Sequence, residues 1–543
     1  MSNWSQIGTD IDGLVENGQS GSSVALSGDG TTLLVSTPLI NGDGTDYGTA
    51  GIIQSYTIDI LNSTLISDGE GGKVTGNYGD YMDAVSVSDD GSVIAVGGIG
   101  IDGTDTNTGG FNLYERLFDS SGNVNWIEKD GRTGPSENSY FGRELKLSGD
   151  AKTIIVGAPK YAYEGDENNG AIWINTISDD FEITNAKSIG GYTNGEFGTI
   201  NAIDLSDDGT VAVFGVSSPS VTEATVDSNT DATAGVIYQY RLNDGVWDQG
   251  FYQRGDGIYD RFGYSVAISG DGNSIYVGAR GQNRNNNITR PVPDNDISTG
   301  SSLVLQHASI HPTNSSPGWW QINNEIFGVS GSDYDGHTVD ISDDGSVIAM
   351  ASSKANDNAG RVRIFKDFGD GEWTQIGSDI NGEAAGDYSG GDISLSDNGS
   401  TIAIGAAGND NANGVGSGHT RIYSLRRNDN SPLSLTDINT LDNSKDSSNQ
   451  LYISTKNNDF ASDLSGDDDT FVLTGEFEDY SISRNGDLLM IDDSRSNGDG
   501  FDWLKNIENI QFADQTVEES KVDIVKTYSG EFSDYKFYNQ GDG

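Results

Sequence analysis

Apolar and polar residues alternate in a short phrase that recurs seven times along the chain. Its apolar positions lie two residues apart, as with Val85 and Val87 or Ile203 and Leu205, and a Ser closes it. This period of two is typical of a β-strand with one buried face. The closing serines are Ser27, Ser88, Ser148, Ser206, Ser269, Ser342 and Ser396, spaced 54 to 73 residues apart.

Each phrase is followed by the signature of a tight turn. Six of the seven copies place Asp-Gly or Asn-Gly after the Ser, and Gly accepts the positive φ that such turns need. The third copy has Asp150-Ala151, which we expect to form a less favourable turn because it lacks this Gly.

Three further strands complete each repeat. An apolar strand follows the turn, and a variable polar loop leads to a third strand that opens with Gly. A fourth strand often carries Trp, as at Trp126, Trp247, Trp319 and Trp373. Four short antiparallel strands in about 60 residues, repeated seven times, predict an all-β chain built on a seven-bladed β-propeller.

The strand count also predicts how the ring closes. The seventh repeat lacks a Trp-type fourth strand, whereas the N-terminal residues 3–11 (NWSQIGTDI) closely match residues 372–380 (EWTQIGSDI) of the sixth repeat. We therefore expect the N-terminal strand to complete the seventh blade, which removes the exposed sheet edges.

Two of the repeats resemble a known family. Residues 261–279, with Arg-Phe-Gly-Tyr-Ser and Val-Gly-Ala, and residues 140–159, with Tyr-Phe-Gly and Val-Gly-Ala-Pro, resemble the FG-GAP repeats of integrin-α-type propellers. The resemblance covers about residues 1–427. That family often carries an Asp-x-Asp-x-Asp-Gly calcium loop, but the turns here supply fewer oxygens than the 6–8 that calcium takes. We therefore interpret their aspartates as turn formers.

The C-terminal part is predicted to be a separate, small β-rich module. Residues 428–459 read as a linker, and its Ser/Asn/Asp-rich part, 428–450, shows no periodicity. Residues 460–517, with DGFDWLKNIENIQFAD near their end, resemble a module found beside the calcium-binding repeats of haemolysin-type (RTX) bacterial proteins. We place this module at 460–520. A second copy begins within 521–543 and stops at Gly543, so we expect the natural protein to continue.

The net charge and the composition exclude several classes of function. The chain has 83 acidic and 30 basic residues, a net charge of −53, so phosphate backbones and anionic membranes would repel it. It has no Cys, which excludes disulfides, thiol catalysis and cysteine zinc sites. No apolar run is long enough to span a membrane, and no standard N-terminal signal peptide is present.

Proteins that the C-terminal module resembles use type I secretion, which implies an extracellular or cell-surface location.

Calcium is the expected cofactor, and clusters of oxygen-bearing side chains are its candidate ligands. They lie in the C-terminal module and in two propeller loops, where such residues alternate as at the start of a calcium loop. The candidate ligands are Asp467, Asp468, Asp469, Asp499, Asp502, Asp102, Asp105, Asn107, Asn409, Asn411 and Asn413.

One insertion carries a local positive patch. Arg280, Arg284 and Arg290 lie in and beside the longest loop, between the fifth and sixth blades. On so acidic a chain, these arginines are candidates for binding an acidic glycan or a surface protein. The alternative interpretation is an ordinary surface loop.

The fold leaves the function open. Our first hypothesis is a bacterial adhesion or ligand-binding protein that uses the propeller as a platform; no catalytic residue is assigned. The alternatives are a secreted hydrolase of a polysaccharide or ester with its active site at the propeller channel, and a structural surface-layer or appendage subunit. Polar residues with shifted pKa values at the channel mouth would favour the hydrolase, and a channel of small apolar residues would argue against it.

Overall fold

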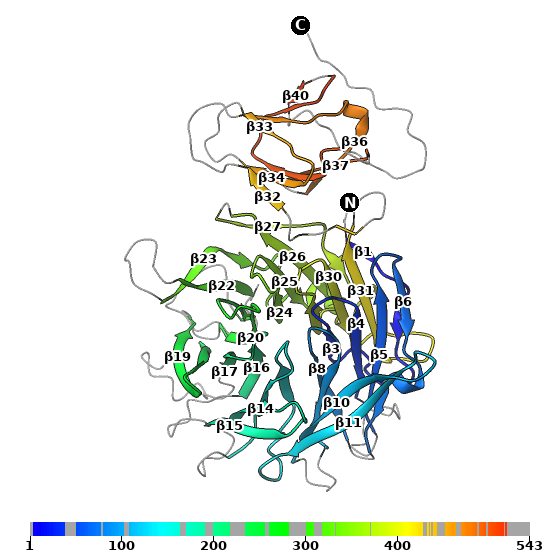
Figure 1. The fold of residues 1–543 in the computed structure, drawn as a ribbon, viewed down its shortest axis with the longest axis vertical. Coiled ribbons are helices and arrows are strands. Elements are labelled where there is room, and N and C mark those ends of the chain that lie inside the picture. Colours follow the sequence, from blue (N-terminus) through cyan, green and yellow to red (C-terminus); the bar gives the residue numbers. More distant parts are fainter. Residues whose placement is uncertain are drawn as a thin grey trace. The chain divides into compact units, whose positions relative to one another are not determined.

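Seven antiparallel sheets, arranged as blades around a common axis, make up most of the chain (Figure 1). The computed structural model describes residues 4–518 except for 39–49, 78–79, 102–107, 163–169, 191–198, 218–233, 256–259, 282–299, 309–317, 332, 370, 427–431, 434, 436–437, 442–450, 463–468, 486–487, 496–497 and 515. The chain divides into two compact units, Ser2–Asp437 and Ile438–Gly543.

The recurring phrase forms the innermost strand of every blade. Neighbouring innermost strands contact one another in a closed circle, so they line the central channel. These strands are β3 (Val24–Leu26), β8 (Met82–Val87), β12 (Glu144–Leu147), β16 (Thr199–Leu205), β20 (Phe262–Ile268), β24 (Thr338–Ile341) and β29 (Asp392–Leu395).

The second strand of each blade is the most deeply buried, because adjacent blades cover both of its faces. All six residues are buried in every second strand except β17, where the last side chain is not described. These strands are β4 (Thr32–Thr37), β9 (Val93–Gly98), β13 (Thr153–Ala158), β17 (Val211–Ser217), β21 (Ser274–Ala279), β25 (Val347–Ser352) and β30 (Thr401–Ala406).

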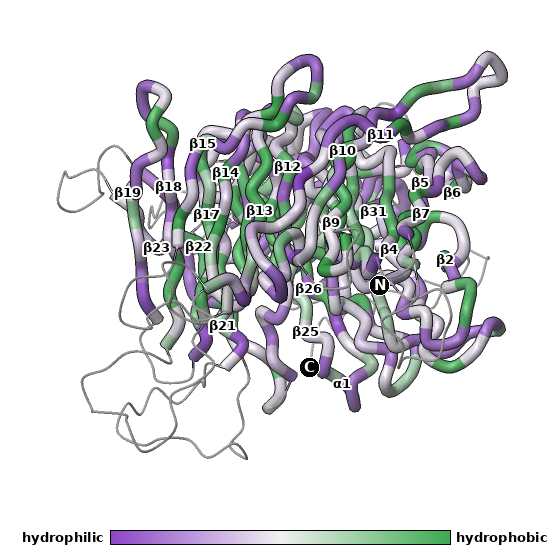
Figure 2. The backbone as a smooth tube through the Cα atoms, turned by 90° about the horizontal axis from the view of Figure 1, so that it is seen from below, coloured by the Kyte–Doolittle hydropathy of each residue, from purple (hydrophilic) through white to green (hydrophobic). Residues whose placement is uncertain are grey.

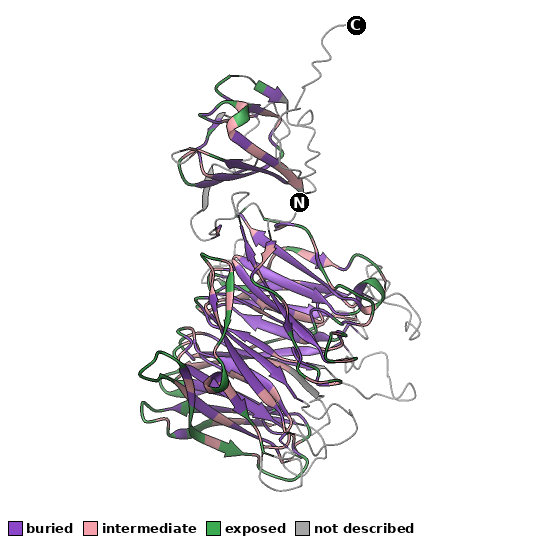
Figure 3. Ribbon diagram, turned by 90° about the vertical axis from the view of Figure 1, so that its right-hand side faces the viewer, coloured by how far each residue is buried: buried purple, intermediate pink, exposed green. Residues whose placement is uncertain are grey.

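Burial falls toward the outer strands and the hairpin tips (Figure 3), and hydrophilic residues are frequent at the hairpin tips (Figure 2). The third strands are β5 (Ile52–Asp59), β10 (Gly110–Phe118), β14 (Ala171–Ile177), β18 (Val236–Asn243), β22 (Ser301–Ala308), β26 (Arg361–Asp367) and β31 (His419–Leu425). The fourth strands are β6 (Thr64–Ser67), β11 (Val124–Thr133), β15 (Ile183–Gly190), β19 (Val246–Arg254), β23 (Gly318–Phe327), β27 (Trp373–Gln375) and β1 (Trp4–Gln6).

The N-terminal strand closes the ring, as the sequence predicts. β1 pairs antiparallel with β31, with Trp4 opposite Leu425, and β2 (Ile11–Asp12) extends the same edge. The Trp4 indole also donates a hydrogen bond of 2.9 Å to the Ile376 carbonyl of the sixth blade. The seven-bladed, nearly all-β fold is therefore confirmed. β7 (Lys73–Thr75) and β28 (Ile380–Asn381) add similar short edges, and the one described α-helical turn is α1 (Ala355–Asn358).

The C-terminal unit is built differently, from strands that pair in parallel. β32 (Ile438–Leu441), β34 (Asn458–Ser462) and β38 (Phe501–Lys505) form one parallel series, and β33 (Leu451–Ile453), β35 (Thr470–Val472) and β39 (Asn509–Gln511) form another. β36 (Tyr480–Asn485), β37 (Leu488–Asp493) and β40 (Thr516–Glu518) add antiparallel edges.

This parallel arrangement begins inside the segment that the sequence treats as a linker. The first strands of both series, β32 and β33, lie within residues 428–459. Their pairing with strands beyond residue 457 makes them part of the second unit. Its core contains Phe471, Leu489, Leu504 and Ile510, all at most 1% exposed.

Candidate functional site

The hairpin turns that end the innermost strands form a ring at one mouth of the channel. Backbone N–H groups donate from turn to turn across all seven blades, at 2.9 to 3.4 Å. The bonds run from Asp29 to Asp89, Asp89 to Gly149, Asp150 to Asp207, Asp207 to Gly270, Gly270 to Asp343, Asp343 to Asp397, and Asp397 to Gly28. The ring fixes the position of every turn relative to its neighbours.

The second turn residue of each copy is a turn former, as the sequence predicts. Its side-chain oxygen accepts a hydrogen bond from the preceding Ser hydroxyl in all seven copies, for example from Ser27 to Asp29 at 2.7 Å. The same oxygen also accepts a backbone N–H two residues later, as from Thr31 to Asp29 at 2.8 Å. Ala151 takes φ +57°, a conformation like that of the Gly in the other copies.

The first turn residue has a different role, which the sequence analysis does not anticipate. Around the ring this position is Gly28, Asp89, Gly149, Asp207, Gly270, Asp343 and Asp397. A Cβ on each glycine would collide with a neighbouring carboxylate: Asp397 at Gly28, Asp89 at Gly149, and both Asp343 and Asp207 at Gly270. The glycines thus leave space into which four carboxylates converge at the mouth.

Three of these carboxylates, Asp89, Asp207 and Asp397, have raised pKa values. Burial, a hydrogen bond to Asp343 and the charge of Asp89 raise the pKa of Asp207 to about 8. Burial and the charges of Asp89 and Asp343 raise the pKa of Asp397 to about 7, and burial also raises that of Asp89. Because Asp343 is exposed and Asp89, Asp207 and Asp397 are half-buried, the cluster is open to solvent.

A second level of charged residues lies along the innermost strands, two residues before the closing Ser. The Lys146 ammonium lies 3.1 Å from an Asp204 carboxylate oxygen, and the charges of Asp204 and Asp340 raise its pKa. Burial raises the pKa of Asp340 to about 7. Asp204 and Asp340 also accept backbone N–H groups of the next blade, from Ile268 at 2.7 Å and Leu395 at 2.6 Å.

A third level repeats the pattern further along the channel. Burial raises the pKa of Glu144 to about 8 and that of Asp392 to about 6, and Asp392 accepts the Val24 N–H at 2.8 Å. Burial raises the pKa of Asp83 to about 7, although the charge of Arg143 acts in the opposite direction. The channel therefore holds many more carboxylates than cations, which suits it to bind cations or cationic groups.

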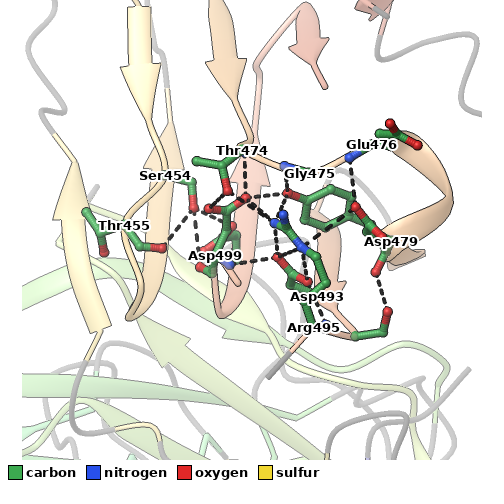
Figure 4. Close-up of polar contacts among 12 residues, drawn as sticks. Ser454, Thr455, Thr474, Gly475, Glu476, Asp479, Asp493, Arg495 and Asp499 are labelled. Atoms are coloured by element: carbon green, nitrogen blue, oxygen red, sulfur yellow. Dashed lines mark hydrogen bonds and ion pairs between the residues drawn. The ribbon is translucent and has the colours of Figure 1, made fainter. Parts of the chain in front are cut away.

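Asp499, one of the predicted calcium ligands, takes part in a hydrogen-bonded network of the C-terminal unit (Figure 4). Asp499 accepts hydrogen bonds from the Thr474 backbone and hydroxyl at 2.6 Å, from the Tyr480 hydroxyl, and from Arg495 at 3.2 Å. Arg495 also pairs with Asp493. A built-in cation therefore already contacts Asp499, and Asp493 shares it.

Asp502 lies in a more acidic environment. Its carboxylate accepts the Asp459 N–H at 3.1 Å and the Ser454 hydroxyl at 3.1 Å. Burial and the charges of Asp459 and Asp499 raise its pKa well above the ordinary value. Asp469, also a predicted ligand, is fully buried, and its N–H donates to Glu508 at 3.0 Å.

The other described candidates lie in the propeller. The side-chain amides of Asn411 and Asn413 donate hydrogen bonds to backbone carbonyls, including that of Gly13. The side-chain oxygen of Asn411 accepts a hydrogen bond from the Asn413 backbone N–H. Asn409 is buried beside them. The Arg280 guanidinium stacks on the Tyr264 ring at 3.6 Å. Asp102, Asp105, Asn107, Asp467, Asp468, Arg284 and Arg290 lie outside the described residues.

The sequence did contain a signal for the channel site. The first turn residue is Gly in the first, third and fifth copies and Asp in the other four. Gly and Asp therefore alternate around most of the ring. Among the described residues, no helix has the length and apolar character needed to span a membrane.

Comparisons with known proteins add little to this geometry. No protein-family model matches the chain, and no curated protein matches it. Similar solved structures include hydrazine synthase of Kuenenia stuttgartiensis, at 13% identity over 74% of this chain and 94% of that one, with a TM-score of 0.43. The periplasmic gluconolactonase of Pseudomonas aeruginosa shows 13% identity over 66% and 85%, with a TM-score of 0.40. Similarities at this level carry no information about activity.

Proposed function

We propose that the protein is an extracellular or cell-surface binding protein whose propeller mouth holds a calcium ion that contacts the ligand. The observation that carries this proposal is the gathering of Asp89, Asp207, Asp343 and Asp397 around the solvent-open mouth, where Asp207 and Asp343 share the space above Gly270. Calcium prefers carboxylate oxygens and takes 6–8 of them, so an ion at this mouth keeps positions for outside oxygens. Glycan hydroxyl or carboxylate groups are ligands of that chemistry.

Titration calorimetry with calcium on the chelator-treated full chain tests the proposal. Asp207→Asn removes one ligand from the mouth, and Asp244→Asn removes the same charge from an exposed hairpin tip. We expect a calcium site that D207N weakens and D244N leaves unchanged. Glycan-array binding that needs calcium in the wild type and fails in D207N would extend the result to the ligand. Equal calcium affinity in both variants would contradict the proposal.

A hydrolase is the second candidate, and one contact favours it. The Asp207 and Asp343 carboxyls share a hydrogen bond, and the pKa of Asp207 is raised to about 8. At neutral pH such a pair holds one proton, so one group can act as a general acid while the other acts as a base. Hydrolysis of nitrophenyl glycosides or esters by the wild type, lost in both D207N and D343N, would support this function. No turnover of such substrates would leave only the binding function.

We also propose that the C-terminal unit is a calcium-associated, RTX-like module and that the protein is exported by type I secretion. Its parallel strand series and buried acidic groups, together with the resemblance over residues 460–517, support this proposal. An antibody against the chain should label intact source cells or their culture medium. Antigen confined to the cell interior would refute the export.

A further inference from the structure

Three side chains from separate segments meet where the ring closes. His419 begins β31, Asp10 lies between β1 and β2, and Glu383 follows β28 of the sixth blade. One ligand-type atom from each lies within 4.8 Å of the others. The cluster therefore joins the N-terminal segment, the seventh blade and the connection from the sixth blade.

The spacing of these groups fits metal ligands better than direct hydrogen bonds. His419 Nδ1 and Glu383 Oε2 are 3.8 Å apart, which is too far for a hydrogen bond but ordinary for two ligands of one ion with bonds of about 2.1 Å. Asp10 is oriented by a hydrogen bond of 2.7 Å from the Gln6 amide. The Arg421 guanidinium is engaged by the Asn381 carbonyl at 2.9 Å and lies 3.9 Å from the other Glu383 oxygen.

The His419 imidazole is buried, and one of its two nitrogens has no hydrogen-bond partner in the described part of the chain. The His419 side chain is 1% exposed, and its Nε2 has no hydrogen-bond partner among the described residues. The other ring nitrogen, Nδ1, faces Glu383, and an imidazole nitrogen beside two carboxylates is a donor set that metal ions use in proteins.

In the sixth blade, an arginine side chain occupies the position equivalent to His419. Its Arg361 begins β26 as His419 begins β31, and its Asp379 corresponds to Asp10 in the matching N-terminal segment. Arg361 lies 3.8 Å from Asp379 and forms ion pairs with Asp333 at 3.0 Å and Asp335 at 3.1 Å. The equivalent place in the seventh blade has carboxylates but lacks this permanent side-chain cation.

We propose that Asp10, Glu383 and His419 bind a divalent transition-metal ion of the Zn²⁺ class that ties the N-terminal segment to the ring. One imidazole and two carboxylates suit such an ion, whereas calcium takes oxygen ligands. The ion replaces the charge that Arg361 supplies in the sixth blade. This site is separate from the channel mouth and does not depend on its function.

Zinc titration calorimetry on the chelator-treated full chain tests the site, with millimolar calcium present to occupy the carboxylate sites. We expect one zinc equivalent whose affinity falls at least about tenfold in His419→Gln and Glu383→Gln. His307→Gln is the matched control, because His307 packs against Trp319 in another blade. Zinc should also raise the melting temperature of the wild type but not that of E383Q.

Glu383 is exposed, so E383Q keeps the test valid even if H419Q fails to fold. The proposal is overturned if no saturable zinc binding occurs. It is equally overturned if E383Q and H307Q bind zinc as the wild type does.

Discussion

Asp207 and Asp343 belong to different blades, yet their carboxyls share a hydrogen bond in the space above Gly270. The turn of the blade between them carries Gly270, whose missing side chain leaves room for both groups. Two carboxylates this close cannot both ionise without a cation, because like charges raise one another's pKa. A proton shared by the two groups, or the calcium ion proposed above, would relieve this repulsion.

Asp207→Asn should change stability and calcium binding in opposite directions. At pH 9, above the raised pKa of Asp207, removing one charge relieves repulsion at the calcium-free mouth, so the melting temperature in chelator should rise. Calcium should then raise the melting temperature less than in the wild type, because one ligand is lost. Thermal melts with and without calcium measure both effects, with D244N as the charge-matched control. A variant that melts lower in chelator would contradict the repulsion argument.

The calcium-free protein should lose stability as pH rises from about 4 to 8. The pKa values of Asp207, Glu144 and Asp340 are raised from ordinary values of 3.8 to 4.5 to about 7–8, so the native state binds more protons than the unfolded chain in this range. Their protonated forms stabilise the fold fully below the unfolded values, and that contribution fades as pH passes the folded values.

Denaturant melts at several pH values measure this slope. Calcium should flatten the slope, because calcium binding releases the shared protons at neutral pH. Proton release can be measured separately by calorimetry in buffers of different ionisation enthalpy. A calcium-free protein whose stability rises between pH 5 and pH 8 would show that the carboxyls are ionised and paired.

Gly270→Ala should disturb the mouth without unfolding the propeller. The added Cβ would lie 1.5 Å from an Asp343 oxygen and 2.0 Å from an Asp207 oxygen, so both carboxyls must move. We expect weaker calcium binding with circular dichroism unchanged. Gly391→Ala is the control, because Gly391 is exposed and its added Cβ would meet only the Tyr388 carbonyl oxygen, at 3.3 Å. Unchanged affinity in G270A would place the calcium elsewhere.

Asp499→Asn should destabilise the C-terminal unit whether or not calcium is present. The change weakens the hydrogen bonds from Thr474 and Tyr480 and unbalances the charge of Arg495, at a cost of about 1–3 kcal/mol. Glu478→Gln, which alters an exposed charge, should have little effect. Hydrogen exchange of strands β36 to β38 measures the result locally. If only the calcium-bound form is destabilised, Asp499 is a calcium ligand instead.

The sequence by itself determined the architecture of the propeller. Alternation at positions such as Val85 and Val87, the Gly in six of the seven turns, and the matching segments at Trp4 and Trp373 are local signals. They specify strands, hairpins and ring closure because strand pairing depends on period, turn residues and the need to cover sheet edges. The role of the second turn aspartate was equally predictable, because its hydrogen bonds lie within five residues.

The channel site was decided only by tertiary structure. Asp207 and Asp343 are far apart in the sequence, and each alone looks like another turn residue. The raised pKa of Asp207 arises because closing the ring brings the blades' turns together around one axis. Likewise, His419, Asp10 and Glu383 meet only because the N-terminal strand pairs with β31. Convergence of charge depends on distances across the closed ring, which local sequence patterns do not encode.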